Sequence, residues 1–118
     1  MSQAQKTRRE AAEAFFALIP HSRVLGLEIV EVEESALVAR VTGGAELVGN
    51  PYSNHIHGGV ITTLIEQTSG TAALISLEQP EPVATLDLRV DHLRPALLGA
   101  PLYARAECYR VTRNIAFV

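Results

Sequence analysis

HGGVITTLIEQTSGTAALIS, residues 57–76, is the stretch that decides the fold. It predicts a helix over 58–76 whose apolar stripe is too wide for a surface helix, so we expect most of this helix to be buried. Glu66 is its only ionisable side chain, and an acidic side chain is almost never fully buried without a compensating partner. This carboxylate is therefore a candidate functional group. The apolar positions are Val60, Ile61, Leu64, Ile65, Ala72, Ala73, Leu74 and Ile75.

The start of the helix offers a second functional group. Gly58 and Gly59 bring bare backbone N–H groups to a helix N-terminus, where unpaired donors and the helix dipole attract a polarised carbonyl or a developing anion. Glu66 follows Gly59 by seven residues, which places it about 10 Å further along the same helix. One helix cannot bring its own carboxylate to its own N-terminus. Two antiparallel copies could, so we predict a composite site at a homodimer interface.

Composition narrows the class of protein. The chain has 118 residues, which is enough for one domain over 1–118, and 47% of them are hydrophobic and 19% charged, as in an ordinary globular protein. A net charge of −3 gives no reason to expect nucleic-acid or anionic-membrane partners. The single cysteine, Cys108, excludes an intrachain disulfide framework, and no apolar run approaches a membrane span. We expect a cytoplasmic protein with Cys108 in its core.

The segments before the central helix predict a helix and a hairpin. Residues 3–18 have helical periodicity, with Pro20 as the expected end. Apolar residues then alternate between 25 and 42, which predicts a β-hairpin that Gly43 and Gly44 terminate. Residues 45–56 are rich in turn formers, so we expect a loop there.

Strands dominate the prediction after the helix. Residues 83–93 and 102–111 alternate between apolar and polar side chains, and 112–114 predict a turn into a last strand that begins at Ile115. Because that strand stops at Val118, we expect the sheet to lack a complete final strand. One long buried helix with a strand-rich remainder indicates an α+β domain, in which an antiparallel sheet curves around the helix.

The motifs together resemble the hotdog-fold acyl-CoA thioesterases of the PaaI-like group. The resemblance covers roughly residues 19–118 and depends on Gly49-Asn50-Pro51, on the HGG entry with an acid nine positions after its histidine, on 84–90 and on 93–96. It implies a long helix wrapped by a curved sheet. It also implies assembly into homodimers, which often pair into homotetramers. The implied reaction is hydrolysis of an acyl-CoA to coenzyme A and a carboxylic acid, without a metal or separate cofactor.

The resemblance also implies roles for individual residues. Glu66 matches the catalytic carboxylate, either as nucleophile or as general base, and Gly59 resembles the residue whose backbone N–H polarises the thioester carbonyl. His57 matches a supporting histidine, and Thr85 the hydroxyl residue that orients water. Asn50 is similar to the catalytic asparagine that positions substrate or water, with Asn54 as its competitor. The remaining candidates are substrate contacts: Gly58 at the helix N-terminus, and Arg94 and Arg113 for the phosphates of coenzyme A.

Alternative interpretations stay open for these residues. Glu66 could form an ion pair at a dimer interface, His57 could only cap the helix, and Thr85 could be an ordinary strand residue. His55 and His57 have the spacing of a metal pair, but no further clustered ligand accompanies them. We expect His21 and His92 to be structural. Rival functions are a non-catalytic acyl-CoA binder and a hotdog dehydratase or hydratase, and the acyl-chain preference is not encoded in any single motif.

Overall fold

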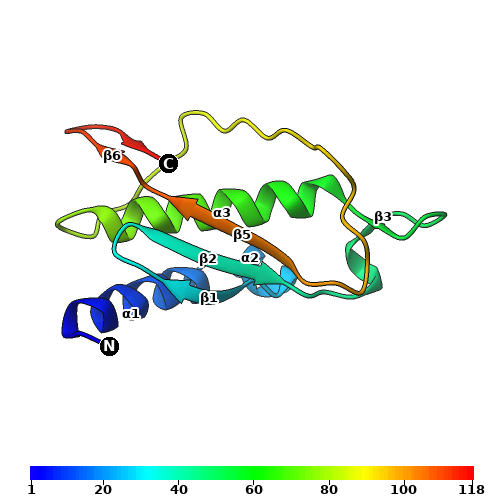
Figure 1. The fold of residues 1–118 in the computed structure, drawn as a ribbon, viewed down its shortest axis with the longest axis horizontal. Coiled ribbons are helices and arrows are strands. Elements are labelled where there is room, and N and C mark those ends of the chain that lie inside the picture. Colours follow the sequence, from blue (N-terminus) through cyan, green and yellow to red (C-terminus); the bar gives the residue numbers. More distant parts are fainter.

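The fold is one long helix packed against a small antiparallel sheet (Figure 1). The structure is a computed structural model that describes residues 1–118. Its helices are α1 (Gln3–Leu18), α2 (Pro20–Leu25) and α3 (Gly58–Ser76), with a 3₁₀ turn η1 (Ala45–Leu47). Its strands are β1 (Glu28–Val32), β2 (Ala36–Val41), β3 (Val48–Asn50), β4 (His55–Ile56), β5 (Leu102–Glu107), β6 (Arg110–Val111) and β7 (Ala116–Phe117). The predicted α+β architecture is confirmed.

Helix α3 buries one face against the sheet and α1. Leu64 and Thr68 lie four residues apart on this face, and Thr68 satisfies its buried hydroxyl by donating to the Leu64 carbonyl oxygen, while Thr71 does the same to Gln67. The helix therefore buries two threonines with both of their hydroxyls hydrogen-bonded. Its buried residues are Val60, Leu64, Thr68, Thr71, Ala72, Ala73 and Ile75.

The three main strands form a sheet in the order β1-β2-β5. Strand β2 is central, and it pairs antiparallel with β1 (Val32 opposite Leu37) and with β5 (Leu37 opposite Ala106). Leu37 and Ala106 are buried with residues of α1 and α3. The predicted hairpin is confirmed, and so is the placement of Cys108 in the core, where it is a buried free thiol.

Residues 83–93 are not a strand, which corrects the sequence prediction. The segment is extended, but it pairs with no other strand and none of its backbone groups takes part in a backbone hydrogen bond. Figure 1 shows it in yellow, on the other side of α3 from β1 and apart from the three-stranded sheet. Leu86 is 80% exposed and Leu93 is 92% exposed. An alternating sequence fits a pleated strand, but a strand forms only where another strand lies beside it.

The other boundary predictions need smaller corrections. Helix 3–18 is confirmed, but Pro20 opens a second short helix, because proline suits the first helical position. The expected loop 45–56 contains η1, β3 and β4. The expected strand 102–111 is interrupted after Glu107, and its last part pairs with β7 across the predicted turn. Among the helices, none is both long and apolar enough to cross a membrane.

Candidate functional site

The N-terminus of α3 is shaped by His57. The His57 N–H donates to the Leu47 carbonyl oxygen at 2.8 Å, which ties the helix entry to η1. Its ring Nδ1 then accepts the N–H of Gly59 at 2.8 Å and so caps the helix. Because Nδ1 is the acceptor, the neutral ring carries its proton on Nε2.

The two glycines at this end differ in their hydrogen bonding. The Gly59 N–H, the carbonyl donor expected from the resemblance, donates instead to the His57 ring. The Gly58 N–H has no partner within the chain. The unpaired donor of the helix N-terminus is therefore one residue earlier, and it is exposed to an incoming carbonyl.

His92 also lies at this helix end. A Cβ added to Gly58 would be 3.6 Å from Cε1 of the His92 ring, which makes His92 a neighbour of the unpaired N–H. The sequence alone indicated a structural role for this histidine. Its proximity to Gly58 depends on the course of residues 83–93 over α3, which no local pattern encodes.

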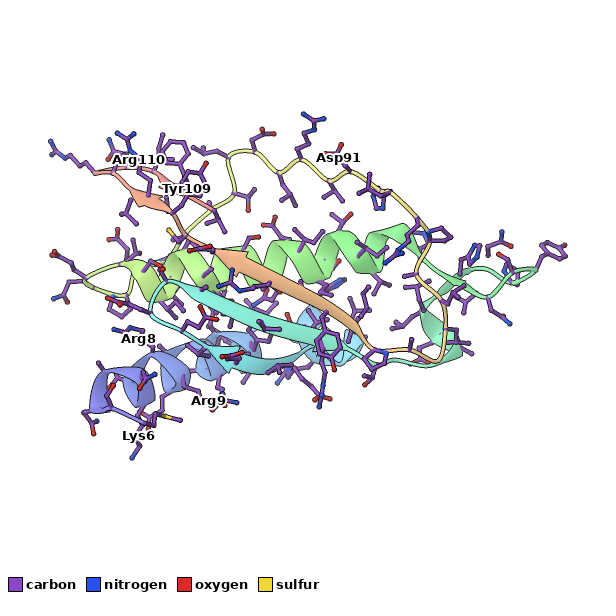
Figure 2. All side chains as sticks on the ribbon, viewed as in Figure 1. Lys6, Arg8, Arg9, Asp91, Tyr109 and Arg110 are labelled. Atoms are coloured by element: carbon purple, nitrogen blue, oxygen red, sulfur yellow. The ribbon has the colours of Figure 1, made fainter.

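Glu66 is half-buried on α3 and has a hydrogen-bond partner. The hydroxyl of Thr85 donates to Glu66 Oε1, so two candidates that are far apart in sequence are brought together. The Thr85 side chain comes from the extended segment 83–93, whose side chains project from both sides of the trace in Figure 2, where Asp91 is labelled. The carboxylate thus has a hydroxyl donor, and no ion pair involves it.

A cleft of about 750 Å³ opens beside this carboxylate. Its walls come from α3, from residues 81–88 and from residues 109–118, and more than half of the lining residues are hydrophobic. Tyr109, labelled in Figure 2, packs its ring against Phe117 in one wall, with ring centroids 6.2 Å apart. Arg113 also lines the cleft. An apolar cleft with a carboxylate, a hydroxyl and a guanidinium can bind an amphipathic acyl ligand.

The remaining candidates lie elsewhere on the surface. Asn50 Oδ1 accepts the Tyr52 N–H at 3.1 Å within a turn. Asn54 has a left-handed backbone with φ 55°, and its backbone carbonyl oxygen accepts the Leu98 N–H. Arg94 is exposed and forms no ion pair. None of these three lines the cleft beside Glu66.

The candidate residues of one chain therefore form two separate groups, the candidate half-sites. The first contains His57, Gly58 and Gly59, and the second contains Glu66 and Thr85. Glu66 lies seven positions after Gly59, about 10 Å along the axis of α3. A reacting carbonyl has to lie within about 3 Å of both its donor and its attacking group, so the two half-sites of one chain cannot serve the same carbonyl.

Comparison with known proteins identifies relatives over most of the chain. The profile of the family described as "Thioesterase superfamily" matches residues 53–118. The medium/long-chain acyl-CoA thioesterase YigI of Salmonella typhimurium is 30% identical over 105 residues, which cover 78% of this chain and 68% of that protein. A crystal structure of a protein from Pseudomonas aeruginosa has a TM-score of 0.80 and 39% identity over 92% of this chain and 81% of that one. The PaaI protein of E. coli, from the phenylacetic acid degradation operon, has the same fold, with a TM-score of 0.79 and 21% identity over 94% of this chain and 77% of that one.

Proposed function

Because this chain belongs to the thioesterase superfamily and has the hotdog fold, we propose that it hydrolyses an acyl-CoA to free coenzyme A and a carboxylic acid. The observation that carries the proposal is the half-buried Glu66 carboxylate, which accepts a hydrogen bond from Thr85 at the edge of a largely apolar cleft. The acyl chain would occupy this cleft. Arg113 in its wall and Arg94 would meet the coenzyme A phosphates by charge.

The chemical step needs a donor for the carbonyl oxygen. The unpaired Gly58 N–H suits this role, and the Gly59 N–H could join it if the His57 ring released it. Glu66 would either attack the thioester carbon directly or remove a proton from an attacking water, with Thr85 fixing the carboxylate. If Glu66 is the nucleophile, collapse of the tetrahedral intermediate breaks the C–S bond and leaves the acyl group on Glu66 as a mixed anhydride, which a water then hydrolyses to the carboxylic acid. If Glu66 is the base, the oxygen of the attacking water becomes part of the acid when the C–S bond breaks. In both routes the thiolate of coenzyme A leaves and takes up a proton.

We infer that a homodimer completes the site. The separation of the two half-sites along α3 supports this inference, because a second antiparallel copy would set its Glu66 beside the Gly58 end of the first. Residues 83–93 supply a candidate contact, since eleven extended residues without backbone partners form an open edge that a second copy can pair with. A dimer of dimers is compatible with the same contact.

Thiol release from a panel of short, medium, long and aromatic acyl-CoAs tests the activity. Medium-chain and long-chain acyl-CoAs are the first substrates to assay, because the Salmonella relative is named as a medium/long-chain acyl-CoA thioesterase. We expect turnover by the wild type and its loss in Glu66→Gln and His57→Ala. Binding of an acyl-CoA without turnover would instead support a non-catalytic binder, and addition of water to an enoyl-CoA would support a hydratase.

Mixing two inactive variants tests the composite site. If Glu66→Gln and His57→Ala chains exchange freely, half of the dimers are mixed and each mixed dimer holds one intact site, so about a quarter of wild-type activity should return. A site built within one chain would leave every mixed dimer inactive. Two copies of the same variant, mixed in the same way, are the matched control.

A further inference from the structure

Gly49 makes an unusually close approach to His57. A Cβ added to Gly49 would lie 2.8 Å from His57 Cα, 3.0 Å from its Cβ and 3.1 Å from its ring Cδ2. The nearest of these atoms belongs to the backbone, so it cannot rotate away as the end of a flexible side chain would. The hydrogen bond from the His57 N–H to the Leu47 carbonyl oxygen, 2.8 Å long, holds the two segments together. Only a residue without a side chain fits here.

The pairing of β3 with β4 explains how Gly49 reaches this place. Val48 lies opposite Ile56 and Asn50 opposite His55, so the register shifts between them and Gly49 is the extra residue of a β-bulge. A bulge bends its strand and redirects the neighbouring side chains. The bulged glycine therefore lies beside β4, the strand that enters α3.

The His57 ring is held on two sides. Gly49 adjoins its Cδ2 edge, and on the other side Nδ1 accepts the Gly59 N–H. The contact with Gly59 is also tight, because a Cβ on Gly59 would lie 2.9 Å from Nδ1. A small displacement of the ring would break the cap and shift Nε2 relative to the Gly58 N–H.

We propose that Gly49 is a positioning residue that sets the place of the His57 ring at the reacting carbonyl. This inference rests on the proposed thioesterase function for its catalytic consequence, but the placement of the ring can be measured without any turnover. Gly49 itself touches no reacting atom and acts through His57. Any side chain at this position would push the helix entry away from β3.

Gly49→Ala tests the proposal through kinetics. We expect kcat for thiol release to fall about 10- to 100-fold, with KM changed by no more than about threefold, because the misplaced group acts on the reacting carbonyl. Gly44→Ala is the matched control, since its added Cβ would meet only the end of the flexible Glu46 side chain, at 2.9 Å.

Nuclear magnetic resonance gives a readout that is independent of activity. In the wild type we expect an unprotonated Nδ1, a protonated Nε2 and a nuclear Overhauser contact between the Gly49 Hα atoms and the His57 ring Hδ2. In Gly49→Ala the Gly59 amide and the His57 ring resonances should shift, while Gly44→Ala leaves them in place. Absence of the contact in the wild type would overturn the proposal, as would wild-type kcat and His57 resonances in Gly49→Ala. A wild type without turnover but with these resonances would refute the thioesterase function and leave the positioning role supported.

Discussion

Replacing Thr85 by valine removes one hydrogen bond to the Glu66 carboxylate and leaves the side-chain volume nearly unchanged. Hydrogen bonds to charged groups contribute roughly 1.5–3 kcal/mol in mutational series, and the exposure of Thr85 reduces this value to about 1–2 kcal/mol. At 1.36 kcal/mol for each factor of ten in rate, the expected loss in kcat/KM is about 5- to 30-fold. The assay is thiol release at acyl-CoA concentrations above and below KM.

Two further substitutions serve as controls for Thr85→Val. Thr85→Ser keeps the donor, so it should retain activity within about threefold of the wild type. Thr7→Val removes a hydroxyl that donates to the Gln3 carbonyl oxygen on α1, away from the cleft, and should leave the rate unchanged. Wild-type kcat/KM in Thr85→Val, together with an inactive Glu66→Gln, would refute the role of the hydroxyl. An equal loss in the serine and valine variants would assign the effect to packing.

Three other predictions concern stability and assembly. Leu64→Ala, at a residue that is 1% exposed, should lower the free energy of unfolding in urea by about 3–4 kcal/mol. About 2.4 kcal/mol of this comes from the three carbon groups that the substitution removes, and the rest from the cavity that it leaves. Leu18→Ala, at a residue that is 73% exposed, should cost under about 0.5 kcal/mol. Leu88→Pro should change the molar mass measured by light scattering from that of a dimer to that of a monomer, and should abolish thiol release. The reason is that proline has no N–H to donate to a paired strand. A dimer of unchanged mass would exclude pairing between the 83–93 segments of two copies. Hydrogen bonds from the backbone N–H groups of Glu46 and Gly44 lower the pKa of the Glu46 carboxyl from 4.5, so the ionised carboxylate stabilises the fold above that pH and this stabilisation is lost as the pH falls. Glu46→Gln should therefore lose less thermal stability than the wild type between about pH 6 and pH 3. Equal changes of melting temperature with pH in the two proteins would contradict this.

The central helix was determined by the sequence alone. The apolar spacing between Val60 and Ile75 and the glycine pair at 58–59 specify a buried helix with an open N-terminus, and both are local properties of the chain. The hairpin of β1 and β2 was predicted for the same reason, because alternation with period two is visible in one dimension. Glu66 was recognised as a candidate functional group because a lone carboxylate in an apolar helix can be seen in the sequence itself.

Only the tertiary structure decided which groups meet. Residues 83–93 alternate as a strand does, yet no neighbouring strand pairs with them, so the pattern alone gave the wrong structure. The same segment brings Thr85 to Glu66 and His92 to Gly58, contacts that depend on how it passes over α3. The bulge that sets Gly49 against His57 depends on a register shift between two short strands. Periodicity records the environment of each residue along its own element, whereas contacts between elements arise from packing between segments far apart in the sequence.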